Sequence, residues 1–194
     1  MALTSAESRL LKRLATLHEE KDRAALAALR RGLGKPPGRA PEMWPVLLPY
    51  LPETIPRRVL DRCLVIAALF ASHPEPWDGP EEPWARNLGA SLRRFDEAQL
   101  RGDPLDKAPS PGIQRRLVAL LKSEEAELPD RLRHAVALLK SGDVPVHWGQ
   151  LLTDLGRWTV PDRPVQRAWA RSFWGGRGLD APTVTEDPDA DDEG

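Results

Sequence analysis

The chain has 194 residues, a formal net charge of -1 and a single cysteine, Cys63. Its length supports one hydrophobic core without disulfides or metal, and one cysteine excludes both an internal disulfide and a cysteine-based zinc cluster. The longest apolar run, residues 63–71, is far shorter than the ~20 residues of a membrane span. The first leucines are interrupted by charged residues, unlike the apolar region of a signal peptide. We therefore expect a cytoplasmic protein.

Hydrophobic periodicity predicts helices along most of the chain, and no segment alternates as a strand. Thr4 and Glu7 have the spacing of a capping box, so the first helix begins there and is expected to end near His18. A second helix follows the capping residue Asp22 and stops before two glycines. A short helix is predicted around residues 43–48.

The next helix is predicted to have Pro56 at its first position. From residue 59 to residue 70 it is apolar on almost every side, which is typical of the buried centre of a bundle. A Pro-rich acidic loop is expected over residues 72–83, because proline removes a backbone donor and disfavours helix at the preceding residue. Five further helices are predicted over residues 84–95, 113–122, 129–140, 146–158 and 161–174.

The predicted fold class is therefore all-α, a compact bundle of about eight short helices. One domain is expected over residues 1–175, and the loop at 72–83 is where two packed helical lobes would divide. Residues 176–194 are too polar to join a core and are expected to form a disordered acidic tail.

The net charge conceals an uneven distribution. Residues 180–194 contain seven acidic residues and no Lys or Arg, so the rest of the chain has 28 basic and 22 acidic residues, a net charge of +6. Of the 28 cations 22 are Arg, which binds phosphate through two parallel hydrogen bonds. High-GC coding also favours Arg over Lys, and composition alone leaves the two explanations open.

Several predicted helices carry cations opposite their apolar stripe. Arg115 and Lys122 are seven residues apart, as are Arg133 and Lys140, and this spacing places each pair along one helix edge. Edges that carry only cations favour a nucleic-acid surface. Cations near a helix C-terminus also stabilise the helix dipole, which explains part of the pattern without a ligand.

No catalytic or metal constellation is present in the sequence. The four histidines never stand four residues apart, and neither a nucleophile-elbow motif nor a phosphate-binding loop motif occurs. Residues 187–192 lack the glycine and the closing Glu of a calcium loop. We therefore expect no catalytic site, no metal site and no cofactor, and we expect Cys63 to be a core residue.

The aromatic residues are mostly predicted to be core residues. Trp148, Trp158, Trp169 and Phe173 fall on the apolar faces of the last two helices. Trp77 lies in the acidic loop, where it could stack on a base, but packing back onto its own domain is the favoured interpretation.

An ordered set of motifs gives the chain a family resemblance. The motifs are ALAALRRG at 25–32, NLGASL at 87–92, QRRLVALL at 114–121, LRHAVALL at 132–139, PVHWGQLLTDL at 145–155 and QRAWARSFW at 166–174. Over about residues 5–175 they resemble the CasB family, the small subunit of the type I-E CRISPR Cascade complex. His147 stands where the family pattern has an Asp at a helix N-cap, which questions the capping there. The acidic tail and the loop at 72–83 lie outside the shared pattern.

The resemblance implies an all-helical, non-enzymatic subunit that is present in two copies and contacts the backbone and large subunits of the complex. It also implies contacts with the crRNA backbone and with the displaced, non-target DNA strand of an R-loop. The phosphate-contacting candidates that it implies are Arg30, Arg31, Arg57, Arg115, Arg116, Lys122, Arg133 and Arg163. The alternative function is a helical protein-protein adaptor whose basic edges bind an acidic partner.

Overall fold

The computed structural model describes residues 3–99 and 109–175, and within these ranges all regular structure is helical. Nine α-helices and three short 3-10 helices are present there, without a strand. The predicted all-α fold is therefore confirmed. The expected acidic tail, residues 176–194, lies outside the described residues.

The nine α-helices are α1 (Ser5–Glu19), α2 (Arg23–Arg30), α3 (Trp44–Leu47), α4 (Arg57–Ser72), α5 (Leu88–Gln99), α6 (Pro111–Leu121), α7 (Leu128–Ser141), α8 (Trp148–Leu155) and α9 (Pro164–Trp174). The 3-10 helices η1 (Pro41–Met43) and η2 (Leu48–Tyr50) flank α3, and η4 (Glu125–Glu127) leads into α7.

Both predicted N-terminal caps are present. The Thr4 hydroxyl accepts a hydrogen bond from the Glu7 amide at 3.3 Å, and the Glu7 carboxylate accepts one from the Thr4 amide at 2.8 Å. The Asp22 carboxylate accepts from the Ala25 amide at 2.9 Å at the start of α2. These side chains satisfy amides that have no partner within the helix, so the sequence rules located both starts correctly.

Six predicted helix starts differ from the structure. α6, α7 and α8 begin at residues 111, 128 and 148 rather than at 113, 129 and 146. Pro56 is the N-cap of α4 rather than its first residue, and α5 begins at Leu88 rather than at residue 84. The buried Asn87 explains the later start of α5, because its Oδ1 accepts from the Ala90 amide at 3.1 Å while its Nδ2 donates to the Ser172 hydroxyl at 2.8 Å. In the last helix, residues 162 and 163 adopt positive φ angles, so α9 begins at residue 164 instead of 161.

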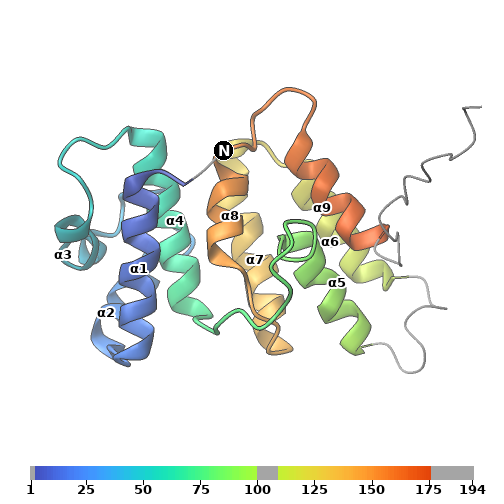
Figure 1. Cartoon of the computed structure of the whole chain (residues 1–194), viewed down its shortest axis with the longest axis horizontal. Coiled ribbons are helices and arrows are strands. Elements are labelled where there is room, and N and C mark those ends of the chain that lie inside the picture. The colour runs from blue at the N-terminus through green and yellow to red at the C-terminus, as the bar shows by residue number, and fades with distance from the viewer. Residues whose placement is uncertain (1–2, 100–108, 176–194) are drawn as a thin grey trace, which may run out of the picture.

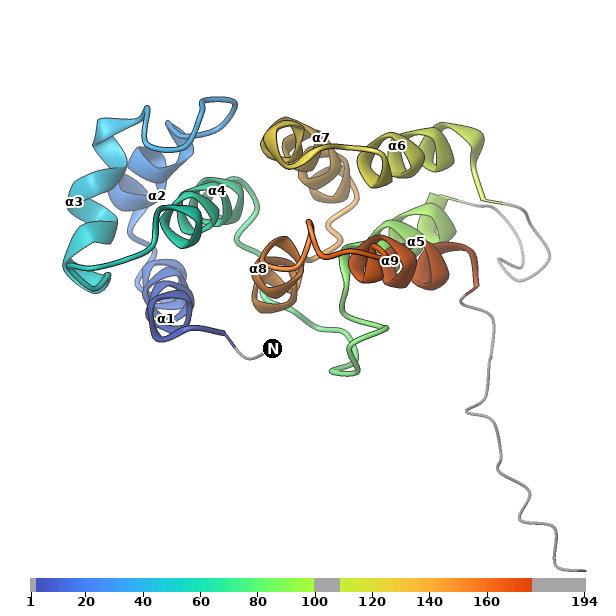
Figure 2. The same ribbon diagram turned by 90° about the horizontal axis from the view of Figure 1, so that it is seen from above.

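The helices form two groups that meet along α4 (Figures 1 and 2). Helices α1 to α4 lie on one side and α5 to α9 on the other, and the segment 73–87 connects them. α4 packs against α1 and α2 within its own group and against α7 and α8 of the other. The predicted central position of this helix is confirmed, and one continuous hydrophobic cluster joins both groups.

The core of the second group is built around α5, α8 and α9. A side chain at Gly89 would overlap the Trp169 carbonyl, so α5 and α9 approach closely only because residue 89 is glycine. Trp169 is completely buried, and its Nε1 donates to Asp154 Oδ2 at 2.7 Å. Gln150 donates to the other carboxylate oxygen at 2.7 Å. Burial raises the pKa of Asp154, although these two hydrogen bonds oppose the shift.

The remaining core predictions are also met. Trp148, Trp158 and Phe173 are buried like Trp169. Cys63 is buried with a free thiol, and burial raises its pKa to about 12. None of the described helices is long and apolar enough to cross a membrane.

Candidate nucleic-acid interface

Several of the elements that carry the predicted cations lie along one side of the molecule. Figure 2 shows α7 and α6 beside each other along its upper edge, with the segment after α2 on the same side. α1 lies on the opposite side. A nucleic-acid backbone could therefore follow this side without crossing the segment 73–87, which Figure 2 shows at the lower edge.

The cations of α6 form the first part of this surface. Arg115 and Arg116 are exposed, and Lys122 is exposed directly after the helix ends. The opposite face of α6 buries Ile113, Leu117 and Leu120 in the core. Arg163, before α9, donates a hydrogen bond from Nη2 to the carbonyl of Leu121, so this arginine lies at the end of α6 beside Lys122.

The end of α2 carries the second group. Arg30 and Arg31 are both exposed, and Arg30 Nε donates to the Leu26 carbonyl at 3.1 Å. Both residues lie where the negative end of the helix dipole is, so they also stabilise the helix end.

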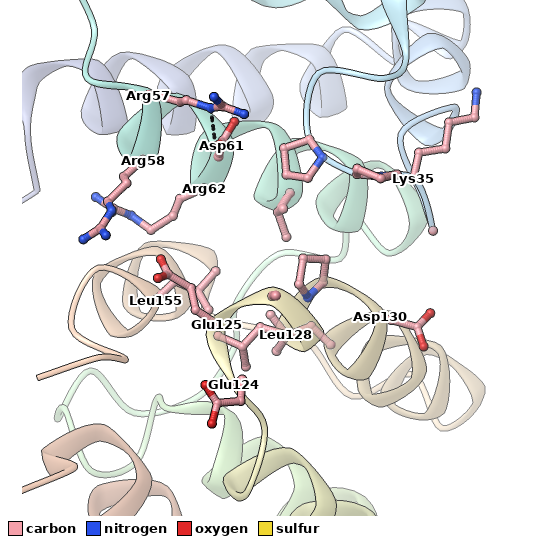
Figure 3. A pocket seen from close by; sticks show the side chains of 17 residues that line it. Lys35, Arg57, Arg58, Asp61, Arg62, Glu124, Glu125, Leu128, Asp130 and Leu155 are labelled. Carbon is pink, nitrogen blue, oxygen red and sulfur yellow. Dashed lines mark ion pairs between the residues drawn. The ribbon is translucent and has the colours of Figure 1, made fainter.

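A groove of about 860 Å³ separates the two groups of helices (Figure 3). Its apolar lining includes Val65, Leu132 and Leu155. One wall, from α4 and the segment 34–37, carries the cations Lys35, Arg57, Arg58 and Arg62. The other wall, from η4 and the start of α7, carries Glu124, Glu125 and Asp130. A phosphate would therefore be attracted to the α4 wall and repelled by the wall facing it.

The cations of the α4 wall differ in availability. The side chain of Arg57 is 92% exposed and lies 3.7 Å from Asp61, a separation at which an exposed ion pair contributes little. Arg58 is exposed and next to it. Arg62 is only 18% exposed and donates to the buried Glu7 carboxylate at 3.1 Å, so it joins α4 to α1. The sequence interpretation missed Arg58, although it adjoins Arg57 in the chain.

Arg133 differs most from its prediction. It is half-buried, and it donates to Asp130 Oδ1 from Nη2 at 2.9 Å and from Nε at 3.2 Å. This hydrogen bonding lowers the pKa of Asp130. The α7 edge is therefore not purely cationic, because Asp130 stands three residues before Arg133 on the same helix face.

The predicted residues thus fall into separate places. Arg115, Arg116, Lys122 and Arg163 lie around α6, Arg57 lies on the groove wall, and Arg133 is engaged by Asp130. Six of the eight candidates form no ion pair within residues 3–99 and 109–175. These six are Arg30, Arg31, Arg115, Arg116, Lys122 and Arg163.

The segment 73–87 is held against the domain. Trp77 packs edge-on against His147 with 5.6 Å between ring centroids, and the Arg94 guanidinium lies 5.5 Å from the Trp77 ring. Trp77 therefore packs back onto its domain, as favoured from the sequence.

His147 caps α8, because its Nδ1 accepts from the Gln150 amide at 2.9 Å. Histidine thus supplies the cap that the family pattern assigns to Asp.

This cap predicts a pH-dependent stability. Burial and the nearby Arg86 lower the pKa of His147 below its ordinary value of 6.5, and Glu81 opposes them only in part. Because the folded pKa lies below the unfolded one, His147 has its full stabilising effect above about pH 6.5 and loses it as the pH falls through the folded pKa. His147→Asn, a neutral cap, should show a smaller drop in urea midpoint from pH 7.5 to 5.5 than the wild type. Equal drops would contradict this role.

The described residues contain no group of three or more His, Cys, Asp or Glu side chains placed to hold a metal ion. The chemical features of the surface described above are thus exposed guanidinium and ammonium groups, which bind anions.

Comparison with known proteins finds relatives of one family. The family model of CRISPR-associated protein Cse2 matches residues 25–174. A CRISPR-associated protein Cse2 of Thermus thermophilus is 34% identical over 153 residues, which cover 78% of this chain and 79% of that protein. The crystal structure of CasB from Thermus thermophilus is similar with a TM-score of 0.69 and 30% identity, covering 89% of this chain and 99% of the other.

A chain of a CRISPR RNA-guided surveillance complex is also similar, with a TM-score of 0.65, 28% identity and coverage of 87% of this chain and 91% of that one. The family match spans more than half of the sequence, and the Thermus relative exceeds 30% identity over more than two thirds of it. The chain therefore belongs to the CRISPR-associated Cse2 family, also called CasB.

Proposed function

We propose that this chain is a non-catalytic, nucleic-acid-binding subunit of a type I-E CRISPR Cascade complex. Two copies would contact the backbone and large subunits, the crRNA backbone and the displaced, non-target DNA strand. The supporting observation is the set of six exposed cations that form no ion pair within the described residues, four of which lie around α6. Cations free of acidic partners remain available to phosphate.

The surface is suited to a backbone rather than to particular bases. Phosphate contacts from Arg and Lys position a protein on a nucleic acid without reading its sequence. Opening DNA for an RNA hybrid is nearly balanced in free energy, so a protein that binds the displaced strand favours the R-loop. We therefore expect these cations to stabilise the R-loop with little dependence on target sequence.

Charge reversal of three of these cations tests the proposal. The variant Arg31→Glu, Arg116→Glu, Lys122→Glu should shorten the lifetime of an R-loop formed by the complete complex at least about 10-fold, since each lost phosphate contact weakens binding and each new acid repels the strand. R-loop lifetime can be followed by the protection of the displaced strand on a supercoiled plasmid.

The matched control is Arg9→Glu, Lys12→Glu, Lys21→Glu, which changes the net charge equally. These three residues are also exposed, and Arg9 and Lys12 belong to α1, on the other side of the molecule. R-loop lifetimes that are equal in the two triple variants would contradict the proposed surface. If neither variant changes nucleic-acid binding, and only binding of an acidic protein is lost, the adaptor function is favoured.

A further inference from the structure

Trp84 is the most exposed of the large hydrophobic side chains in the described ranges. It is 66% exposed, whereas Trp148, Trp158 and Trp169 are buried. It stands in the turn that precedes α5 and belongs to the segment 73–87. An indole ring held in water lacks the free energy that its burial would provide, and Trp is enriched among the residues that protein interfaces bury.

Four hydrogen bonds fix the backbone at Trp84. Its carbonyl accepts from Ser172 Oγ at 2.7 Å and from Asn87 Nδ2 at 3.2 Å. The amides of Ala85 and Arg86 both donate to the Glu82 carbonyl, at 2.9 and 3.1 Å. Ser172 and Asn87 are buried. Because the turn is anchored to α9 and α5, the ring is presented with little backbone freedom, which reduces the entropy lost on binding.

The charges around Trp84 indicate the kind of partner. In the segment 73–87, Asp78 pairs with Arg94 at 2.9 Å and Glu81 with Arg86 at 3.1 Å. The other two acids of the segment, Glu75 and Glu82, are exposed and form no ion pair within the described part of the chain. Glu82 lies in the same turn, two residues before Trp84. Its carboxylate disfavours a phosphate backbone at this turn and favours a basic protein surface.

We propose that Trp84 is the anchor of a protein docking site, and that its partner is a protein surface with an apolar pocket rimmed by Lys or Arg side chains. Tryptophan is among the residues that contribute most to such interfaces, and Glu82 pairs with the rim. The site is separate from the cations of α6 and α2. The partner is taken to be another protein of the same complex, and this part of the inference rests on the proposed function.

The test uses a complex reconstituted from its other protein subunits and crRNA, immobilised, with this chain added in solution. Trp84→Ala should raise the dissociation rate at least about 10-fold. Glu82→Lys should instead lower the association rate several-fold and reduce its dependence on salt. Trp174→Ala is the control, because Trp174 is also partly exposed but its Nε1 donates to Gln114 Oε1 at 3.2 Å within the domain.

The outcomes separate this inference from the proposed function. Dissociation rates that are equal for wild type and Trp84→Ala, with unchanged urea midpoints, would overturn the docking site and leave the nucleic-acid role intact. If Trp84→Ala weakens binding of single-stranded DNA but not binding to the complex, a base stacks on the ring, and the docking site is again overturned. If the Arg31, Arg116 and Lys122 variant does not shorten the R-loop lifetime, that result contradicts only the proposed function and leaves the docking site intact.

Discussion

Replacing Trp169 with alanine should lower the free energy of unfolding by about 5 kcal/mol. Removing a fully buried aromatic ring costs about 3–5 kcal/mol. The change also removes the donor to Asp154 Oδ2, and leaving a buried acceptor unpaired costs about a further 1–3 kcal/mol. Because small domains are stable by only about 5–15 kcal/mol, this loss is about a third or more of the total stability. Urea denaturation followed by circular dichroism measures the loss.

Trp169→Phe separates the two contributions. Phenylalanine keeps much of the ring but cannot donate, so this variant should lose about 2–3 kcal/mol. If the phenylalanine variant is as unstable as the alanine variant, the hydrogen bond to Asp154 dominates. If the alanine variant loses less than about 2 kcal/mol, Trp169 does not have the central packing role described here.

Binding to single-stranded DNA should weaken about 100-fold when the salt concentration rises from about 50 to about 200 mM. For single strands the logarithm of the binding constant falls with the logarithm of salt by ~0.7 per neutralised phosphate. Six candidate cations form no ion pair in the described residues. Arg30 and Arg115 donate to carbonyls of their own helices through Nε only, which leaves both Nη groups free, whereas an Nη group of Arg163 is engaged by the Leu121 carbonyl. We therefore count about five phosphate contacts. Fluorescence anisotropy with oligonucleotides of different sequence measures both the slope and the expected weak sequence dependence.

The triple variant of Arg31, Arg116 and Lys122 provides the control for this slope. With three fewer contacts, the same change in salt should weaken its binding only about 7-fold. A salt dependence that is the same in the variant and the wild type would mean that other cations neutralise the phosphates.

Local sequence rules were sufficient for most of the fold. Helix starts that depend on near neighbours, such as the Thr4 and Asp22 caps, were predicted correctly because both partners lie within three residues. The start of α5 was wrong because Asn87 is fixed by Ser172, which is 85 residues away in the chain. Periodicity carries no information about such a distant partner.

The candidate site was predictable only in part, for the same reason. Periodicity correctly placed Arg115 and Lys122 on an exposed edge, because the apolar residues of α6 determine its orientation. It could not show the groove, whose two walls come from α4 and from η4 with α7. The pairing of Arg133 with Asp130 was within reach of the sequence, since the two residues are three apart on one helix.

The buried thiol of Cys63 has a practical consequence for fluorescence experiments. Maleimide dyes react with the accessible thiolate, and a completely buried thiol with a pKa of about 12 is almost entirely protonated at neutral pH. Cysteines introduced at exposed positions on α4 and α7 could therefore be labelled without first replacing the native one. A donor and an acceptor dye placed in this way would report the width of the groove in real time while single-stranded DNA is added.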